Sequence, residues 1–163
     1  MPSTNPASAT KPSTGLAIER WSATSSNGRP SRASLVLTGG GRRWRAHATG
    51  NGAVDALLRA ADDALAPLLG PGVQLLTYEV HAAGPGHETE AIVTVSIGSR
   101  DPGASAAYPG RATHENVLEA SLAAYVDAIG RYVADQGVDV AASAPAPGDT
   151  ARHDAEPEHE VRS

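Results

Sequence analysis

The chain has 163 residues and contains no cysteine, no phenylalanine, one methionine, two tryptophans and four tyrosines. The absence of cysteine excludes disulfides and thiolate chemistry. With so few aromatic side chains, the core must be built from Ala, Val, Leu and Ile, which favours thin packed layers. The same scarcity removes the aromatic stacking platforms on which proteins hold single-stranded nucleic acid.

An excess of positive charge and long apolar runs are also missing. The formal net charge is −5, so the basic footprint of a nucleic-acid-binding protein is absent, and Arg42, Arg43 and Arg45 are interpreted as an exposed strand face. No apolar run approaches membrane-spanning length. The first residues lack the basic and apolar regions of a signal peptide. We therefore expect a cytoplasmic protein with no nucleic-acid partner and no membrane partner.

Small and polar residues dominate both ends of the chain. Residues 1–14 are mainly Pro, Ser, Thr and Ala, and residues 138–163 are rich in Ala, Pro, Asp and Glu. Such segments bury too little apolar surface to offset the entropy of ordering. We expect a disordered N-terminal tail, a single folded domain over residues 15–137 and a disordered acidic C-terminal tail.

Three strand patterns separated by turn residues occupy the first part of the domain. They cover Gly15–Ser25, Ala33–Thr38 and Arg42–Thr49. In the first strand, simple alternation places Leu16 and Ile18 on one face and Ala17 and Trp21 on the other. In the third, alternation separates one set, Trp44, Ala46 and Ala48, from another, Arg43, Arg45 and His47. Short turns between the strands predict an antiparallel meander.

A helical pattern follows the third strand. Its apolar stripe consists of Val54, Leu57, Leu58, Ala61, Leu65 and Leu68. Asn51 is a plausible N-cap, and Asp55 near the helix start agrees with the helix dipole. Pro67 and Gly70 are expected to end the helix.

The same succession of patterns then occurs again. Further strands are predicted over Val73–Ala83, Glu90–Gly98 and Ser105–Arg111, the first with Leu76, Tyr78, Val80 and Ala82 on one face. Thr113 is expected to cap a second helix, and Gly137 to end it as a C-cap glycine. The apolar stripe of this helix consists of Val117, Leu118, Ser121, Leu122, Tyr125, Ile129 and Val133.

Repetition of the strand–strand–strand–helix pattern defines the predicted fold. One three-stranded sheet with one helix is too small to bury both elements, whereas two such units packed together can do so. We therefore predict an α+β protein of two βββα units, 15–70 and 73–137, related by pseudo-two-fold symmetry. Each unit is predicted to hold an antiparallel three-stranded sheet and one packed helix.

The segment between the first sheet and the first helix, Gly50–Asp55, has the composition of an anion-binding turn. Glycines permit close approach of another group, and the first turn of a helix presents unpaired N–H groups and a partial positive charge. A carboxylate or phosphate would suit this place. An ordinary tight turn has the same composition, and the motif alone favours that second interpretation.

Four motifs in order resemble the C-terminal regulatory domain of 2-isopropylmalate synthase, which citramalate synthases share. The turn Gly50–Leu57 resembles the family's Gly-x-Gly-Pro-Val-Asp-Ala signature, and Leu76–Ala82 its Leu-x-Tyr-x-x-His-Ala strand. The strand Thr89–Val95 resembles Ala-x-Ala-x-Val-x-Val, and Asn116–Tyr125 the final helix of the family. The resemblance covers roughly residues 15–133.

The resemblance implies an allosteric or dimerisation domain that binds leucine, the end product of the pathway, between paired βββα units. It implies a pocket at the first helix start, the tyrosine strand and the next strand. Carried over, together with the glycine turn, the candidate ligand-binding residues are Gly50, Asn51, Gly52, Val54, Asp55, Leu75, Tyr78, Ala82, Thr89, Ala91 and Val117. Helix-start N–H groups would hold the amino-acid carboxylate, and Asp55 or turn carbonyls the ammonium.

Two positions depart from the family pattern, and one large part of the family's enzymes has no counterpart. Ala53 replaces a proline at the first helical position, and Thr89 stands where a small apolar residue is usual. The family's catalysis belongs to a separate (β/α)₈ barrel with a metal site, for which 163 residues leave no room. The resemblance therefore implies a free-standing regulatory domain that is not an enzyme and needs no cofactor.

Alternatives remain at this stage. His81 and His87 with Glu88 and Glu90 match no established metal-ligand spacing, so no metal site is assigned. One interpretation is a homodimeric regulatory domain for leucine or a related branched-chain amino acid, with action in trans on a 2-isopropylmalate synthase as one option. Another is a dimerisation scaffold that has lost its ligand. A third interpretation is a detached portion of a 2-isopropylmalate synthase, an acetyl-CoA-dependent acyltransferase, without activity alone.

Overall fold

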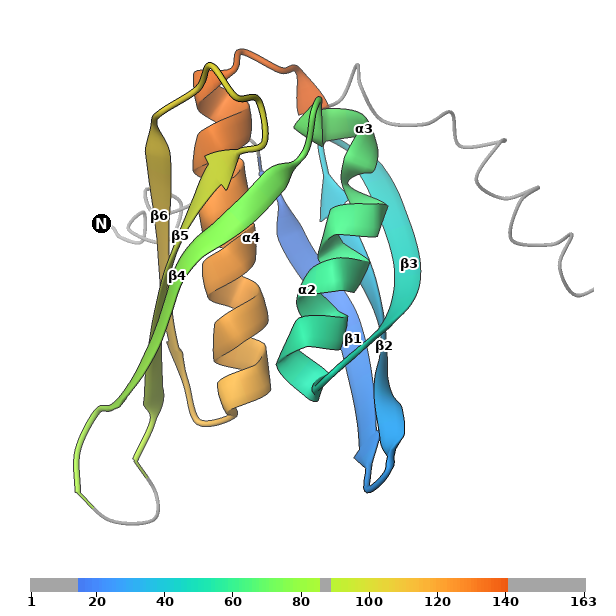
Figure 1. Cartoon of the computed structure of the whole chain (residues 1–163), viewed down its shortest axis with the longest axis vertical. Coiled ribbons are helices and arrows are strands. Elements are labelled where there is room, and N and C mark those ends of the chain that lie inside the picture. The colour runs from blue at the N-terminus through green and yellow to red at the C-terminus, as the bar shows by residue number, and fades with distance from the viewer. Residues whose placement is uncertain (1–14, 86–88, 141–163) are drawn as a thin grey trace, which may run out of the picture.

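A computed structural model describes residues 15–85 and 89–140 (Figure 1). The elements in chain order are β1 (Ala17–Ser26), β2 (Arg29–Gly39), β3 (Arg42–Gly50), α2 (Ala53–Ala64), α3 (Ala66–Leu69), β4 (Val73–Ala82), β5 (Ala91–Ser99), β6 (Ala107–His114) and α4 (Val117–Asp135). The predicted tails over residues 1–14 and 141–163 lie outside the described residues. Val140, in the segment that sequence assigns to the acidic tail, is buried in the core.

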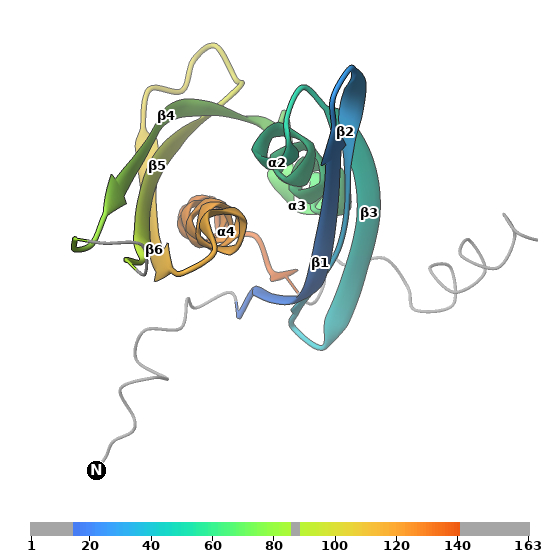
Figure 2. The ribbon, with the colours of Figure 1, turned by 90° about the horizontal axis from the view of Figure 1, so that it is seen from below.

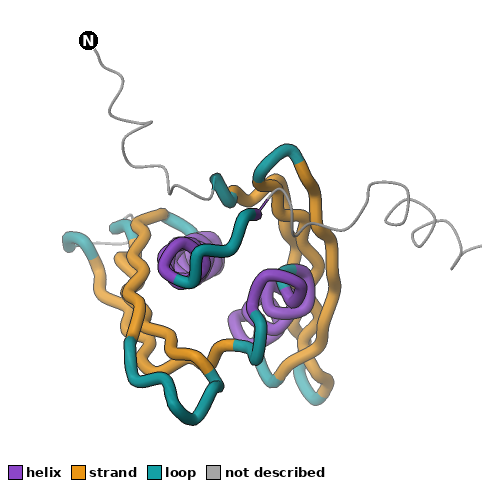
Figure 3. Tube along the Cα trace, turned by 90° about the horizontal axis from the view of Figure 1, so that it is seen from above, coloured by secondary structure: helices purple, strands orange, loops and turns teal. Residues whose placement is uncertain are grey.

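Two antiparallel sheets and the helices that follow them make up the fold. Strands β1-β2-β3 form one sheet, here called sheet A, and β4-β5-β6 form the other, sheet B. Helix α2 packs on β2 and β3, and α4 packs on β5 and β6. Both long helices lie between the two sheets, as Figures 2 and 3 show from opposite ends. The predicted α+β fold of two βββα units is confirmed.

Each sheet has an inner face toward the helices and an outer face away from them. In sheet A, register pairs Leu37 with Trp44 and Leu35 with Ala46, and Leu35, Leu37 and Trp44 are buried on the inner face. The intervening Arg43 and Arg45 are exposed on the outer face. The alternation predicted for the third strand is therefore confirmed.

For the first strand of each unit, the predicted assignment of residues to the two faces is wrong on one side of a β-bulge, which both β1 and β4 contain. In β1 the register shifts between Ile18 and Arg20, so Ile18 pairs with Leu37 and Trp21 with Leu35, both on the inner face. In β4 it shifts between Leu75 and Thr77. An extra residue reverses the alternation beyond it.

As a result, Leu75 rather than Leu76 shares the inner face with Tyr78. Leu76 lies instead against Gly98 on the outer face, 3.1 Å from the position of a Cβ built there.

The two bulges occupy equivalent places, which relates the units residue by residue. Trp21 pairs with Leu35, which pairs with Ala46. Tyr78 likewise pairs with Val95, which pairs with Gly110. Each aromatic residue lies in the first strand, just after the bulge. Trp21 is therefore the counterpart of Tyr78 in the repeated unit.

Both predicted N-caps are wrong, while Gly137 ends α4 as predicted, directly after the C-cap residue Gln136. Gly52, not Asn51, is the N-cap of α2, and it makes no side-chain cap. Thr113 belongs to β6, which runs past its predicted end, and Asn116 caps α4 by accepting the N–H of Leu118 at 2.8 Å. Gly137 has φ +72° after the end of α4. The N–H of Val138 reaches the carbonyl of Val133 there, a bond that closes a Schellman motif.

Pro67 marks a break between helices rather than a simple end. Helix α2 stops at Ala64, and the short α3 begins after Leu65, with proline in its first turn. The missing N–H of proline is tolerated in a first turn. No helix within residues 15–85 and 89–140 is long and apolar enough to cross a membrane.

Strand β6 and helix α4 approach each other at backbone distance. A Cβ added to Gly110 would lie 1.9 Å from the carbonyl oxygen of Ala124 and 2.7 Å from the amide nitrogen of Ala128. Gly110 and both alanines are buried. Only glycine at this point of β6 allows α4 to sit this close to sheet B.

Substitution Gly110→Ala is expected to lower the free energy of unfolding by about 3 kcal/mol or more, because backbone atoms cannot move aside for the methyl group. Gly103→Ala is the matched control, since its nearest contact would be an ordinary 3.8 Å. The control should change stability by no more than about 0.5 kcal/mol in urea unfolding. Equal effects of the two substitutions would show that the close approach at Gly110 does not constrain the fold.

Candidate functional site

The first part of the candidate site is the turn before α2. The Oδ2 atom of Asp55 accepts the backbone N–H of Asn51 at 2.9 Å and Nε of Arg59 at 3.0 Å. The Asn51 N–H, assisted by Arg59, holds the pKa of the Asp55 carboxyl below its usual value. Asp55 is therefore a charged residue in the first turn of α2, where the helix dipole favours negative charge.

Gly50 is required by packing within the protein. A Cβ at this position would lie 2.5 Å from Oδ2 of Asp55 and 2.7 Å from the amide nitrogen of Ala56. The end of β3 thus passes directly beneath the first turn of α2. This contact accounts for Gly50 without a ligand, so the glycine motif by itself carries no functional conclusion.

The second part of the candidate site lies on the inner face of sheet B. Leu75, Tyr78 and Ala82 follow one another along this face of β4, and Ala82 pairs with Ala91 on β5. Thr89 precedes that strand near the hairpin, its methyl group 3.9 Å from the position of a Cβ built at Gly84. Of these sequence-predicted residues, Ala82 and Ala91 are direct neighbours across the strand pair, whereas Leu75 lies seven residues from Ala82, near the other end of β4.

Tyr78 connects β4 to the start of α4. Its hydroxyl lies 2.7 Å from Oγ of Ser121, and that Oγ donates to the carbonyl of Val117 at 2.7 Å. Ser121 is fully buried and Val117 is exposed at the first turn of α4. Sequence reasoning assigned Ser121 only to the apolar stripe, although a hydroxyl in such a stripe signals a buried hydrogen bond.

Strand β4 is left open on its inner face. Because α4 packs on β5 and β6, it does not cover the first strand of the sheet. Leu75 is consequently 41% exposed and Val80 44% exposed. Helices α2 and α4 begin at the same end of the molecule (Figure 1), so the turn that holds Asp55 and the first turn of α4 both lie at this end.

In the other half of the pseudo-symmetric fold, the residues equivalent to Tyr78 and Asp55 form a direct hydrogen bond. Nε1 of Trp21 donates to Oε1 of Glu119, which lies in the first turn of α4. Trp21 corresponds to Tyr78, and Glu119 holds the position in α4 that Asp55 holds in α2. Trp21 of the first unit therefore bonds the helix of the second unit. Tyr78 of the second unit does not bond the first unit in the same way: it bonds α4 of its own unit, and Asp55 bonds its own turn.

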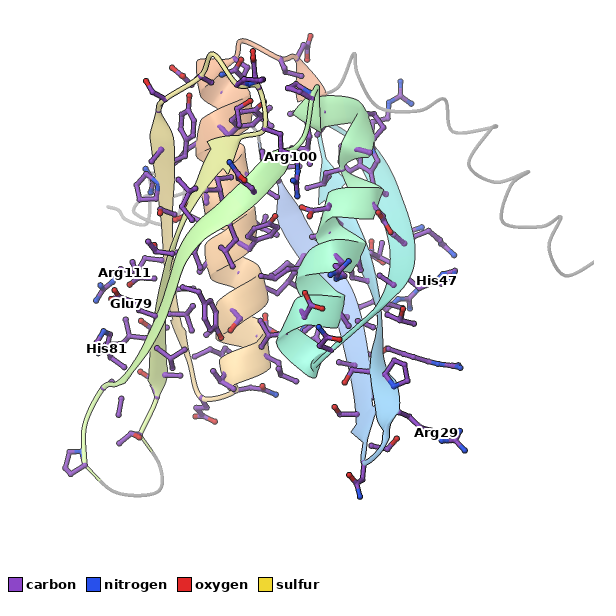
Figure 4. The ribbon with its side chains drawn as sticks, in the orientation of Figure 1. Arg29, His47, Glu79, His81, Arg100 and Arg111 are labelled. Carbon is purple, nitrogen blue, oxygen red and sulfur yellow. The ribbon has the colours of Figure 1, made fainter. Side chains whose placement is uncertain are left out.

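Two further hydrogen bonds hold the units together between the helices. The hydroxyl of Tyr125 donates to Oδ1 of Asp62 at 2.6 Å, and the hydroxyl of Tyr132 donates to the carbonyl of Leu69 at 3.2 Å. Burial raises the pKa of the Asp62 carboxyl, against the lowering effects of the Tyr125 bond and of Arg100 (labelled in Figure 4). Burial and the neighbouring carboxylate raise the pKa of Tyr125, so its hydroxyl remains the donor.

Metal-ligating side chains do not gather in the part of the chain that the structure describes. No group of three His, Cys, Asp or Glu side chains there could hold an ion. His81 lies 3.5 Å from Glu79 on the exposed outer face of sheet B. His87 and Glu88, considered with them at the sequence level, lie outside the described residues.

The bond between Tyr125 and Asp62 predicts a coupled effect on stability. Tyr125→Phe should cost about 1–3 kcal/mol at pH 7, because it leaves a largely buried carboxylate without its donor. The cost should be smaller in an Asp62→Asn background, and a double-mutant cycle from urea unfolding measures the difference.

The pH dependence of the same cycle follows from the raised pKa of Asp62. Because the pKa of Asp62 is higher in the folded than in the unfolded chain, this group stabilises the fold fully at pH values below its unfolded-state pKa, about 3.9. That contribution is lost as the pH rises through the folded-state pKa. The cost of Tyr125→Phe should therefore fall as acid neutralises Asp62. A cost independent of pH and of the residue at 62 would contradict the assigned bond.

Comparison with known proteins places this architecture in a family. Residues 6–133 match the family model of the LeuA allosteric (dimerisation) domain. A 2-isopropylmalate synthase from Aromatoleum aromaticum is 31% identical over 107 residues, which cover 66% of this chain and 19% of that protein. A putative (R)-citramalate synthase from Methanopyrus kandleri is 34% identical over 102 residues, covering 63% of this chain and 19% of that protein.

A 2-isopropylmalate synthase from Sediminispirochaeta smaragdinae is 33% identical over 87 residues, which cover 53% of this chain. The matched segment spans only 16% to 19% of the length of these three relatives. The family model, by contrast, accounts for most of the chain, including both βββα units. The chain belongs to the family of LeuA allosteric (dimerisation) domains.

Proposed function

We propose that this domain binds leucine or a related branched-chain amino acid between the first turn of α2 and the inner face of β4. The observation that carries the proposal is the difference between the two pseudo-symmetric places. Trp21 and Glu119 meet directly across the units, whereas Tyr78 and Asp55 each bond within their own unit. A ligand with one anionic, one cationic and one apolar part would bridge the second pair.

The groups available at this place match the chemistry of an amino acid. The N–H groups of the first turn of α2 lie before the helical hydrogen-bond ladder begins and suit a carboxylate. Asp55 keeps its charge because its pKa is lowered, so it suits an ammonium group. Ala82 and Ala91 leave room for a branched side chain, and Leu75 and Val117 supply apolar surface.

Amino-acid binding should raise the melting temperature of the full chain. At a leucine concentration of 100 times the Kd, mass action adds about 2.7 kcal/mol, which corresponds to a shift of about 10 °C for a domain of this size. Isoleucine and valine should act at higher concentrations or equally, and glycine should not act. Calorimetric titration gives the stoichiometry.

The substitution Ala82→Leu tests the location of the ligand. Its side chain would occupy the space assigned to the ligand, so the leucine-induced shift should disappear. Ala107→Leu is the matched control, because Ala107 is also exposed on an edge strand of sheet B but faces outward from β6. A shift abolished by both substitutions, or by neither, would count against this location.

The same open strand supports a homodimer. Leu75, Val80 and Val117 are large apolar residues exposed on the inner side of sheet B or beside it. Contiguous exposed apolar surface marks interaction sites. We propose that a second copy of the domain covers this side of β4, as the dimerisation function of the family suggests.

Val80→Lys should weaken this dimer at least about tenfold, about 1.4 kcal/mol, because it places a charge in the apolar contact. His81→Lys is the control: the adjacent side chain is exposed on the outer face. Sedimentation equilibrium over a concentration series measures both. A dimer insensitive to Val80→Lys, or a chain that stays monomeric at high concentration, would refute the assigned surface.

A dimerisation domain without a ligand is the second candidate function. Thr89 and Ala53, at positions where the sequence departs from the family pattern, favour it. It predicts a dimer that Val80→Lys disrupts and a melting temperature that no branched-chain amino acid changes. The two candidates are therefore separated by the thermal shift alone.

The regulated partner, in this proposal, is a 2-isopropylmalate synthase, in the same polypeptide or in another on which the domain acts in trans. Similarity of the chain to part of such synthases supports this choice. The domain contributes regulation and not catalysis, because the relatives extend far beyond the matched segment. Activity of a synthase assayed with leucine, with and without the domain, tests the action in trans.

A further inference from the structure

The outer face of sheet A concentrates positive charge in an otherwise acidic chain. Between residues 15 and 50 the sequence has six arginines and a single acid, Glu19, although the chain has a net charge of −5. Five of these arginines are exposed along β1, β2 and β3: Arg20, Arg29, Arg32, Arg43 and Arg45. Glu19 pairs with Arg43 at 2.6 Å. We call this surface the arginine face.

Two adjoining hollows cross the arginine face. One is lined by Thr24, Ser26, Arg29, Pro30, Arg32 and Thr49. The other is lined by Ser22, Thr24, Arg32, Ala33, Ser34, His47, Ala48 and Thr49. Arg32 lines both hollows, among hydroxyl groups. Guanidinium and hydroxyl donors are the groups that hold carboxylates in two-point hydrogen bonds.

The outer face of sheet B shows that this charge is not a general property of the fold. At the equivalent place it carries Glu79 and His81 on β4 and Arg111 on β6 (Figure 4). Glu79 and Arg111 flank Thr94 in register. Arg29 and His47 point outward on the opposite side of the molecule (Figure 4). The two outer faces thus differ in charge although the units share one architecture.

The acidic segment follows the end of sheet A at which β1 begins and β2 ends. Residues 141–163 contain five acids, Asp149, Asp154, Glu156, Glu158 and Glu160, and two arginines. The last described residue, Val140, is buried in the core on the inner face of sheet A at this end, so the segment that follows must pass round the end of the sheet to reach the outer face. Its Cγ1 lies 3.3 Å from the position of a Cβ built at Gly39.

The length of this segment suits the surface. Nine residues from Val140 to Asp149 span up to about 30 Å when extended. The distance along β2 from Gly39 to Arg32 is about 24 Å for a strand. Attachment to the same chain also gives the acids an effective concentration in the millimolar range. An external polyanion lacks that advantage and is repelled by the net charge of −5.

We propose that the arginine face is a docking surface for the acidic C-terminal segment, residues 149–160, of the same chain. Its carboxylates pair with the arginines around the two hollows, Arg32 foremost. The surface lies on the opposite side of sheet A from α2, so this contact is separate from the proposed amino-acid site. Failure of either proposal leaves the other standing.

A paramagnetic label at the end of the full chain tests the docking. Because the chain has no cysteine, Ser163→Cys provides a single attachment point for a nitroxide. At about 0.01 M salt, where the Debye length is about 30 Å, amide signals of Ser34 and His47 should lose more than half their intensity. Signals of Thr94 and Arg111 in sheet B should keep theirs. At about 1 M salt, where the Debye length is about 3 Å, the loss should be reversed.

Two variants of the labelled chain separate the arginines from the acids. Arg32→Glu should abolish the intensity loss, and Arg111→Glu, a matched charge reversal on sheet B, should leave it unchanged. Replacing the five acids by Asn and Gln should also abolish it. Because this last variant changes nothing in the described part of the chain, it remains informative if Arg32→Glu does not fold.

Several outcomes would overturn the proposal. One is an equal loss of amide signal intensity on both sheets, and another is a loss of intensity that survives high salt or neutralisation of the acids. A third is a loss that appears only when nitroxide-labelled chains are mixed with separate isotope-labelled chains. The last would assign the contact to a second copy. Binding of a single-stranded oligonucleotide at Arg32 without any effect of the acidic segment would assign the surface to nucleic acid.

Discussion

Close backbone contact between helices and strands is the constraint on which the structure depends. At Gly110 and Gly50, atoms of α4 and α2 occupy the space that a side chain would need. A core without phenylalanine, built largely from alanine, valine and leucine, requires such proximity because small side chains fill only thin layers. Both helices therefore fit between the two sheets, and both sheets turn their outer faces to solvent (Figure 2).

The same constraint decides where a binding site can form. Helix α4 lies against β5 and β6 and leaves β4 uncovered, whereas α2 lies on β2 and β3 and also touches β1. In sheet A the indole of Trp21 donates a hydrogen bond to Glu119 of the other unit. In sheet B Tyr78 bonds Ser121 of its own unit, and Asp55, whose side chain is one methylene shorter than that of Glu119, bonds its own turn and Arg59. The two units thus differ in the aromatic residue of the first strand and in the acid of the first helical turn.

Periodic features of the fold could be predicted from the sequence, and features that interrupt the period could not. The alternation in β3 gave the correct faces, and so did the stripe of α4 except at Val117, which is exposed. The bulges beside Glu19 and Leu76 leave no mark in composition, and they moved Trp21 and Leu75 to the inner face. Capping by Asn116 and the Tyr125–Asp62 bond depend on geometry between elements, which alternation does not encode.

Sharing of β4 between the proposed ligand site and the proposed dimer surface gives the family's allosteric function a physical basis. Tyr78 and Val80 lie two residues apart on one face of an edge strand, the first in the proposed ligand site and the second in the proposed dimer surface. A ligand that bridges Tyr78 to Asp55 would restrict this strand as the Trp21–Glu119 bond restricts β1. If the ligand orders β4, the second copy no longer has to supply the entropic cost of ordering this strand. Ligand binding and dimerisation would then strengthen each other, each raising the affinity of the other by the same factor.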